Sequence, residues 1–135
     1  MSFIKAKDLD KIKTLYLEEI KNPKYEDLLT VGNIVEFYDS IRKNIYYGIV
    51  IDKITSRILI YDNKKVILTP NTEHSSTYWD ITYFKKDFPK YYQGIDIVEI
   101  LAIYKCDEDT SKFKTCNDFY TLFKKLNLKT INERY

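Results

Sequence analysis

Four short segments rich in β-branched and aromatic residues constrain the fold of this chain more than any other feature. They cover residues 31–38, 45–54, 57–61 and 65–69. Segments of this composition and length are typical of β-strands, and Asp62-Asn63-Lys64 between the last two is typical of a hairpin turn. Because the connections are short, we expect the four strands to follow one another as a meander.

Helices are predicted near both ends of the chain. In residues 8–22, apolar residues recur at spacings of three and four and form one stripe. Residues 25–29 then fit a short turn that leads into the sheet. Residues 116–126 show the same helical periodicity, and Thr115 followed by Asp118 resembles a capping box with Asp in place of the usual Glu.

Three further segments lie between the meander and the second helix. The polar residues 70–77 fit a loop. Residues 78–88 fit a short strand or turn and then a helical turn that ends before Pro89. Residues 95–104 are apolar on both alternating faces, which predicts a central strand.

These elements predict one α+β domain over residues 1–135, a length that fits a single core. Several short strands joined by tight turns favour a small SH3-like, curled antiparallel β-barrel or half-barrel. An N-terminal helix and turn in residues 1–29 and a C-terminal helix and tail in residues 109–135 would flank the barrel in residues 31–104.

The charge balance and the two cysteines limit the classes of function. The net charge is +2, from 22 basic and 20 acidic residues, which is too balanced for a dedicated binder of phosphate backbones. Two cysteines without a secretory leader do not make a disulfide framework, and no apolar run reaches membrane-spanning length. We therefore expect a cytoplasmic protein with reduced thiols and no membrane contact.

The sequence offers little for catalysis. Its only histidine, His74, lies in the polar loop near Glu73, Ser75, Ser76 and Asp80. A nucleophile and its base must be held at hydrogen-bond distance, and a loop is a poor scaffold for that. We expect no enzymatic activity, no metal site and no cofactor.

The most unusual stretch of the chain interleaves tyrosines with lysines around Pro89. The chain holds 13 tyrosines, and because buried hydroxyls need hydrogen-bond partners, some of the rings should be exposed. Exposed aromatic residues are typical anchors of protein–protein interfaces. The predicted partner-binding residues are Tyr83, Lys85, Lys86, Lys90, Tyr91 and Tyr92. A half-buried loop whose lysines extend to solvent is the other interpretation of this stretch.

A second aromatic and basic set fits nucleic acid. Small barrels bind single strands by stacking bases on aromatic rings and meeting phosphates with Lys or Arg. The residues that could share one rim for this purpose are Tyr46, Tyr47, Arg57, Lys64 and Lys65.

Three segments resemble small phage proteins. Residues 31–37 (VGNIVEF) resemble the first strand of SH3-like barrels, with Asn33 at a position where Asp is usual, and residues 47–50 (YGIV) resemble the second strand. Residues 79–86, followed by residues 96–100 (DIVEI), resemble the ending of small prophage proteins of Firmicutes. The YopX-like phage proteins share the opening part. The resemblance covers about residues 31–104 and implies a phage or prophage accessory protein.

Together these observations predict a non-enzymatic, phage-type binding protein in the cytoplasm of a bacterial host. It would act by stoichiometric contact with a host or defence protein, for example as an inhibitor of the anti-CRISPR type. A nucleic-acid-binding SH3-like module is the alternative function, and pairing with a second copy of the chain stays open.

Overall fold

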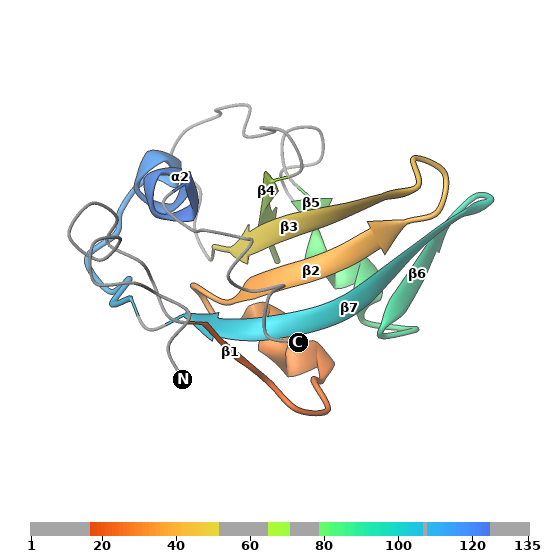
Figure 1. The fold of residues 1–135 in the computed structure, drawn as a ribbon, viewed down its shortest axis with the longest axis horizontal. Helices are drawn as coiled ribbons and strands as arrows, with labels where there is room; N and C mark the ends of the chain where they lie inside the picture. Colours follow the sequence, from red (N-terminus) through yellow and green to blue (C-terminus); the bar gives the residue numbers. More distant parts are fainter. Residues whose placement is uncertain (1–16, 52–64, 71–78, 107, 125–135) are drawn as a thin grey trace, which may run out of the picture.

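The computed structural model of the chain describes residues 17–51, 65–70, 79–106 and 108–124. In chain order the elements are β1 (Leu17–Glu19), η1 (Tyr25–Leu29), β2 (Ile34–Asp39), β3 (Asn44–Val50), β4 (Lys65–Thr69), β5 (Trp79–Asp80), η2 (Ile81–Phe84), β6 (Lys90–Gln93), β7 (Asp96–Cys106) and α2 (Cys116–Lys124). The 3₁₀ helices η1 and η2 lie behind a curved sheet, and α2 lies beside one end of β3 (Figure 1).

The longest strand, β7, organises the sheet. The strand order is β1-β7-β2-β3-β4-β5, and β6 also pairs with β7. Strand β1 pairs with residues 104–106 of β7, whereas β6 pairs with residues 96–99. The prediction of a central strand over residues 95–104 is therefore confirmed, because β7 has partners along both of its edges.

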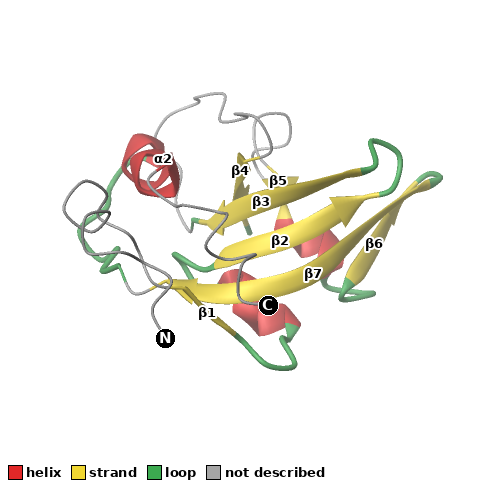
Figure 2. Cartoon of the chain, viewed as in Figure 1, coloured by secondary structure: helices red, strands yellow, loops and turns green. Residues whose placement is uncertain are grey.

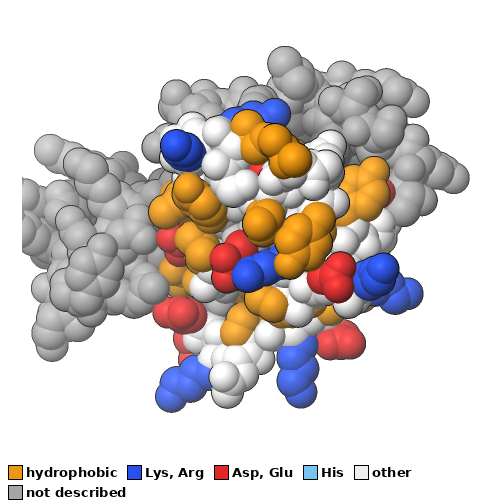
Figure 3. Space-filling view, turned by 90° about the vertical axis from the view of Figure 1, so that its right-hand side faces the viewer, with side chains coloured by type: hydrophobic (Ala, Val, Ile, Leu, Met, Phe, Trp, Pro, Cys, Tyr) orange, Lys and Arg blue, Asp and Glu red, His pale blue; other side chains and the backbone are white. Residues whose placement is uncertain are grey.

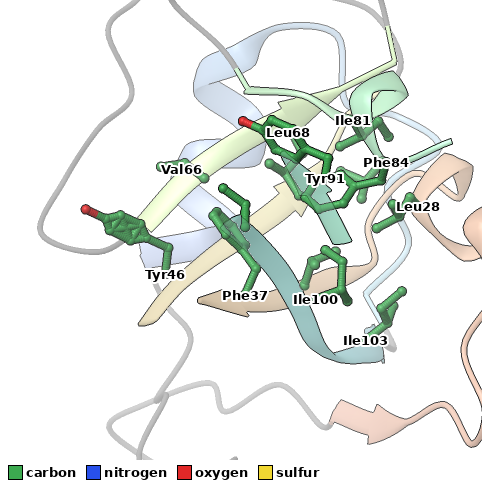
Figure 4. Packing of buried hydrophobic residues seen from close by; sticks show 13 residues of the cluster. Leu28, Phe37, Tyr46, Val66, Leu68, Ile81, Phe84, Tyr91, Ile100 and Ile103 are labelled. Carbon is green, nitrogen blue, oxygen red and sulfur yellow. The ribbon is translucent and has the colours of Figure 1, made fainter. Parts of the chain in front are cut away.

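The sheet carries a buried core on each face. Alternation along β2 and β3 sends successive side chains to opposite cores. The core under η1 and η2, shown in Figure 4, contains Leu28, Val35, Phe37, Tyr46, Val50, Val66, Leu68, Ile81, Phe84, Tyr91, Val98, Ile100 and Ile103. The core under α2 contains Ile34, Tyr47, Ile49, Ile51, Ile67, Ala102, Tyr104, Phe119 and Leu122.

A bulge in β7 lets one strand serve both cores. The register between β2 and β7 shifts between Glu36 and Phe37, which leaves Leu101 as an extra residue. Strict alternation would place Ile100 and Ile103 on opposite faces. Because of the extra residue, both side chains reach the core under η1 and η2.

The N-terminus of α2 is capped as the sequence predicts. The amides of Lys114 and Thr115 donate to Oδ2 of Asp118 at 2.8 and 3.1 Å, and the amide of Asp118 donates to Oγ1 of Thr115 at 3.3 Å. This reciprocal pattern is a capping box. Its bonds fix the start of the helix, which packs Phe119 edge-on against Phe113 with ring centroids 5.0 Å apart.

The predicted helix over residues 8–22 is wrong where the structure describes it. Residues 8–16 lie outside the described ranges, and Leu17–Glu19 form β1. The amide of Ile20 continues the pairing by donating to the carbonyl of Ile103 at 2.8 Å. The edge of β7 needs backbone partners, and this tertiary pairing outweighs the helical periodicity of the segment. The turn expected at residues 25–29 is found as η1.

The predicted antiparallel barrel and its meander are also wrong. Strand β7 lies between β1 and β2, and the pairs β3–β4 and β4–β5 are parallel. Within the described ranges no pairing joins β5 back to β1 or β6, so the sheet is not a closed barrel. The expected strand at residues 57–61 and its hairpin turn lie outside these ranges.

The remaining elements agree with the sequence apart from their bounds. Figure 2 shows β2, β3 and β4 where strands were expected, β5 followed by η2, and α2 near the C-terminus. The loop over residues 70–77 lies outside the described ranges after Pro70. Among the described residues, no helix has the length and apolarity needed to cross a membrane.

Candidate partner-binding site

The stretch of tyrosines and lysines folds around one pocket. Residues of η2, of the turn after it and of β6 border an open pocket of about 520 Å³, which is lined by Tyr83, Lys86, Asp87, Tyr91, Tyr92 and Gln93. Four of the six residues predicted to bind a partner therefore line the same pocket. The other two, Lys85 and Lys90, belong to the same segment but do not line it.

Backbone and side-chain bonds hold this segment in shape. Asp80 caps η2, since its Oδ1 accepts from the amide of Thr82 at 2.9 Å and from the Thr82 hydroxyl at 2.6 Å. The amide of Lys90 donates to the carbonyl of Asp87 at 2.8 Å, which closes the turn around Pro89. Chain reversal at this turn brings β6 back beside η2 and forms the pocket between them.

Tyr91 is the fixed wall of the pocket. Its ring is buried and contacts Phe84 edge-on, with centroids 4.8 Å apart, while Tyr83 lies 5.4 Å away at a tilt of 40°. Figure 4 shows Ile81, Phe84 and Leu68 around it. Burial, assisted by the charges of Asp96 and Asp39, raises the pKa of the Tyr91 phenol to about 12. The hydroxyl therefore stays protonated at neutral pH and donates to Oε1 of Gln93 at 3.4 Å.

A buried polar cluster joins the β2–β3 turn to the β6–β7 turn. Asp39 ends β2 and Asp96 begins β7, and both are buried. Oδ1 of Asp96 accepts from the Ser40 hydroxyl at 2.9 Å and from the Ile41 amide at 3.1 Å, and Arg42 pairs with Asp39. Burial alone would raise the pKa of Asp39. Hydrogen bonds with the Arg42 amide, the side chains of Asp96 and Arg42, and the Ile41 amide outweigh burial and lower it.

Apolar side chains are exposed at the end of the sheet that holds these turns. Ile41 lies in the β2–β3 turn and Ile95, 89% exposed, in the β6–β7 turn; Ile97 is exposed beside them. Tyr83 and Tyr92 are each 57% exposed, and both border the pocket. Figure 3 faces this end and shows hydrophobic side chains gathered there with acidic and basic groups around them. Grouped exposed apolar side chains commonly mark interaction surfaces.

The tyrosines divide between core and surface. Nine of them lie in the described ranges. Tyr46, Tyr47, Tyr91 and Tyr104 are buried, Tyr25, Tyr38 and Tyr120 are half-buried, and Tyr83 and Tyr92 are exposed. The two exposed rings both come from the stretch that the sequence singles out.

Three of the five residues of the nucleic-acid hypothesis lie in the described ranges, and these three do not form an open face. The ring of Tyr46 packs edge-on against Phe37, with centroids 5.7 Å apart, in the core under η1 and η2. Tyr47 belongs to the opposite core, and Lys65 is half-buried. Arg57 and Lys64 lie outside the described ranges. In this fold, the two buried tyrosine rings are not accessible for stacking on a base.

Of the residues weighed for catalysis, the structure describes Asp80 alone. His74 and its neighbours in the loop lie outside the described ranges, and Asp80 serves as the cap of η2. Within the described part of the chain, no group of three His, Cys, Asp or Glu side chains is arranged to hold a metal ion.

Sequence reasoning missed β6 and four polar residues of this region, namely Asp39, Asp87, Gln93 and Asp96. Gly94, with a φ of +64°, marks the tight turn between β6 and β7, and a single Gly between two aromatic and apolar segments was a usable hairpin signal. The pairing of Asp39 with Asp96 had no such signal, because 57 positions separate Ser40 from Ile97 where the two turns meet.

Comparison of the chain with protein-family models, with curated proteins and with solved structures gave no significant match.

Proposed function

We propose that this protein is a binding module that forms a stoichiometric complex with another protein through the β6–η2 end of its sheet. One observation carries the proposal: the two exposed tyrosines, Tyr83 and Tyr92, border the same pocket. Aromatic residues beside a recess are typical binding hot spots, surrounded by contacts that contribute less.

The rigidity of the supporting structure favours binding. Asp39 and Asp96 anchor the two turns from inside, and Tyr91 is wedged between Phe84 and Tyr83. A surface that is already ordered loses little conformational entropy when a partner docks. Exposed Ile95 next to this frame adds apolar area that a partner could cover.

The resemblance to phage proteins suggests the class of partner. We propose a host or bacterial defence protein, with inhibition by surface blockade as the mechanism, as in an inhibitor of the anti-CRISPR type. The protein would need no cofactor for this role, since occupying the partner's surface is sufficient.

A pull-down with matched variants tests the proposal. The tagged full chain is used as bait in bacterial lysate with and without nuclease. We expect a partner that survives nuclease and binds the wild type with defined stoichiometry by light scattering. The double variant Tyr83→Ser/Tyr92→Ser should lose at least ~30-fold in affinity, the scale of a hot-spot loss.

The control variant is Leu29→Ser, which also removes an exposed apolar side chain but in η1. It should bind the partner like the wild type. Equal binding by the double variant would refute the assignment of the surface. Loss of the partner after nuclease, together with a steep loss of affinity in salt, would support the nucleic-acid alternative.

A further inference from the structure

Two tyrosine rings that contact each other form one wall of the pocket. The rings of Tyr83 and Tyr91 lie 5.4 Å apart at 40°, and Phe84 holds the Tyr91 ring from behind. The faces of aromatic rings carry negative potential and attract cations within about 6 Å of the ring centroid. The cavity of about 520 Å³ lies within the range of small-molecule sites, roughly 300–1,000 Å³.

The lining of the pocket carries one carboxylate and one ammonium group. Asp87 places a carboxylate in the lining. The negative charges of Asp96 and Asp39 also act on Tyr91, since they raise the pKa of its phenol as burial does, and the opposing effect of Arg42 is smaller. Lys86 is the opposing charge in the lining. A polar guest can also use the Tyr91 hydroxyl oxygen and the Gln93 side chain as acceptors.

We propose that this pocket binds the guanidinium group of an arginine side chain presented by the partner protein. The inference rests on the proposed function, because it names the chemistry of the contact made there. A planar guanidinium can stack on Tyr83, which is exposed, and donate to the carboxylate of Asp87.

The probe is N-acetyl-L-arginine methylamide, titrated into the ¹⁵N-labelled full chain. We expect chemical-shift changes centred on the amides of Tyr83, Asp87 and Gln93, with saturation in the millimolar range. The neutral isostere, N-acetyl-L-citrulline methylamide, should bind at least about 3-fold more weakly, because it lacks the charge that the rings and the carboxylate attract. Inorganic phosphate should leave these amides unchanged.

Two charge variants should change the affinity for the arginine probe in opposite directions. Asp87→Asn should weaken binding of the arginine probe about 2- to 5-fold, and Lys86→Gln should strengthen it by a similar factor. Tyr83→Leu should weaken it about 2- to 5-fold through loss of the ring face. All three side chains are exposed, so the variants should keep the wild-type spectrum outside the pocket.

Three outcomes would overturn the inference: equal binding of arginine and citrulline probes, phosphate binding that Lys86→Gln removes, or no shift with any probe. A last titration uses agmatine, a free guanidinium compound without a peptide backbone. If it binds more than ~10-fold tighter than the capped arginine, the guest is a free cationic metabolite and not a partner's side chain. The proposed function fails separately, because the Tyr83→Ser/Tyr92→Ser pull-down needs no cationic probe.

Discussion

Replacing Gly48 with alanine should destabilise the protein, because the sheet leaves no room for a methyl group at this position. A Cβ at Gly48 would lie 2.6 Å from Cγ of Leu68, 2.7 Å from Cδ1 and 3.1 Å from Cδ2. Carbon atoms in good contact stand about 3.5–4.0 Å apart. The overlap of about 1 Å falls on the branch carbon, so rotating the end of the Leu68 side chain cannot relieve it.

The magnitude follows from two opposing effects. Overpacking a tight core costs about 1–3 kcal/mol. This cost applies here because the Leu68 side chain is only 1% exposed and lies in the core under η1 and η2. Alanine also lowers the conformational entropy of the unfolded chain relative to glycine, which stabilises the folded state by about 0.4–1 kcal/mol. We therefore expect a net loss of about 1–2 kcal/mol in the free energy of unfolding.

A double-mutant cycle with Leu68→Ala isolates the collision. Leu68→Ala alone should cost about 2–5 kcal/mol through the cavity that it leaves. In that background Gly48→Ala should cost nothing or should stabilise, because its methyl group enters the vacated space. Urea unfolding followed by the fluorescence of Trp79, the single tryptophan, measures all four variants.

Gly94→Ala is the matched control. A Cβ there meets nothing within 4 Å, but the φ of +64° is unfavourable for alanine and should cost about 1 kcal/mol. This cost should be the same with Leu68 or Ala at position 68. Additive effects of Gly48→Ala and Leu68→Ala, or a neutral Gly48→Ala, would refute the packing argument.

Four further predictions concern ionisable side chains. The folded-state pKa of Tyr91, about 12, lies above the ordinary value of 10.0, so the stabilisation is complete below pH ~10 and is lost as the pH rises towards 12. Tyr91→Phe should remove about 1 kcal/mol of the stability difference between pH 9 and pH 11, and an unchanged difference by urea unfolding would contradict the assignment. The pKa of Asp39 is lowered, so its contribution to the free energy of unfolding is present above the ordinary value of 3.8 and is lost as the pH falls through the lower folded-state value. Asp39→Asn should therefore make the free energy of unfolding fall less steeply at acid pH. Asp96→Ala should cost about 1–3 kcal/mol at pH 7, because the Ser40 hydroxyl loses its acceptor and the Ile41 amide keeps only Asp39. The comparison is Asp87→Ala, which removes an exposed acid and should stay within about 0.5 kcal/mol of wild type in urea unfolding. Hydrogen bonds from the amides of Lys114 and Thr115 lower the pKa of Asp118. Asp118→Ala should therefore reduce helical circular dichroism and lower the melting temperature, and an unchanged melting profile would show that the cap is dispensable.

Local patterns in the sequence predicted most of the individual elements. The β-branched segments became β2, β3 and β4, and the capping box at Thr115 and Asp118 starts α2 as predicted. These features depend on residues close together in the chain, whose side chains and backbone satisfy one another directly. The stretch around Pro89 was likewise visible by its composition, although its strand β6 was not.

The arrangement of these elements was decided only by tertiary contacts. Leu17–Glu19 became a strand because the edge of β7 needed backbone partners, which overrides a helical stripe. Parallel pairing of β3 with β4 replaced the expected meander, and nothing in either strand specifies the direction of its neighbour. The pocket likewise depends on the pairing of β6 with β7. Buried Asp39 and Asp96, which join the neighbouring turns, are far apart in the sequence and come together only in the folded sheet.

The sequence by itself thus determined that β2, β3, β4 and β7 are strands, where α2 begins and which stretch holds the exposed tyrosines, because these follow from local spacing and composition. The tertiary structure alone decided that Tyr91 is a buried wall while Tyr83 and Tyr92 remain exposed. Which face of a strand is covered depends on what packs against it, and that neighbour is set by strand order and not by the residue itself.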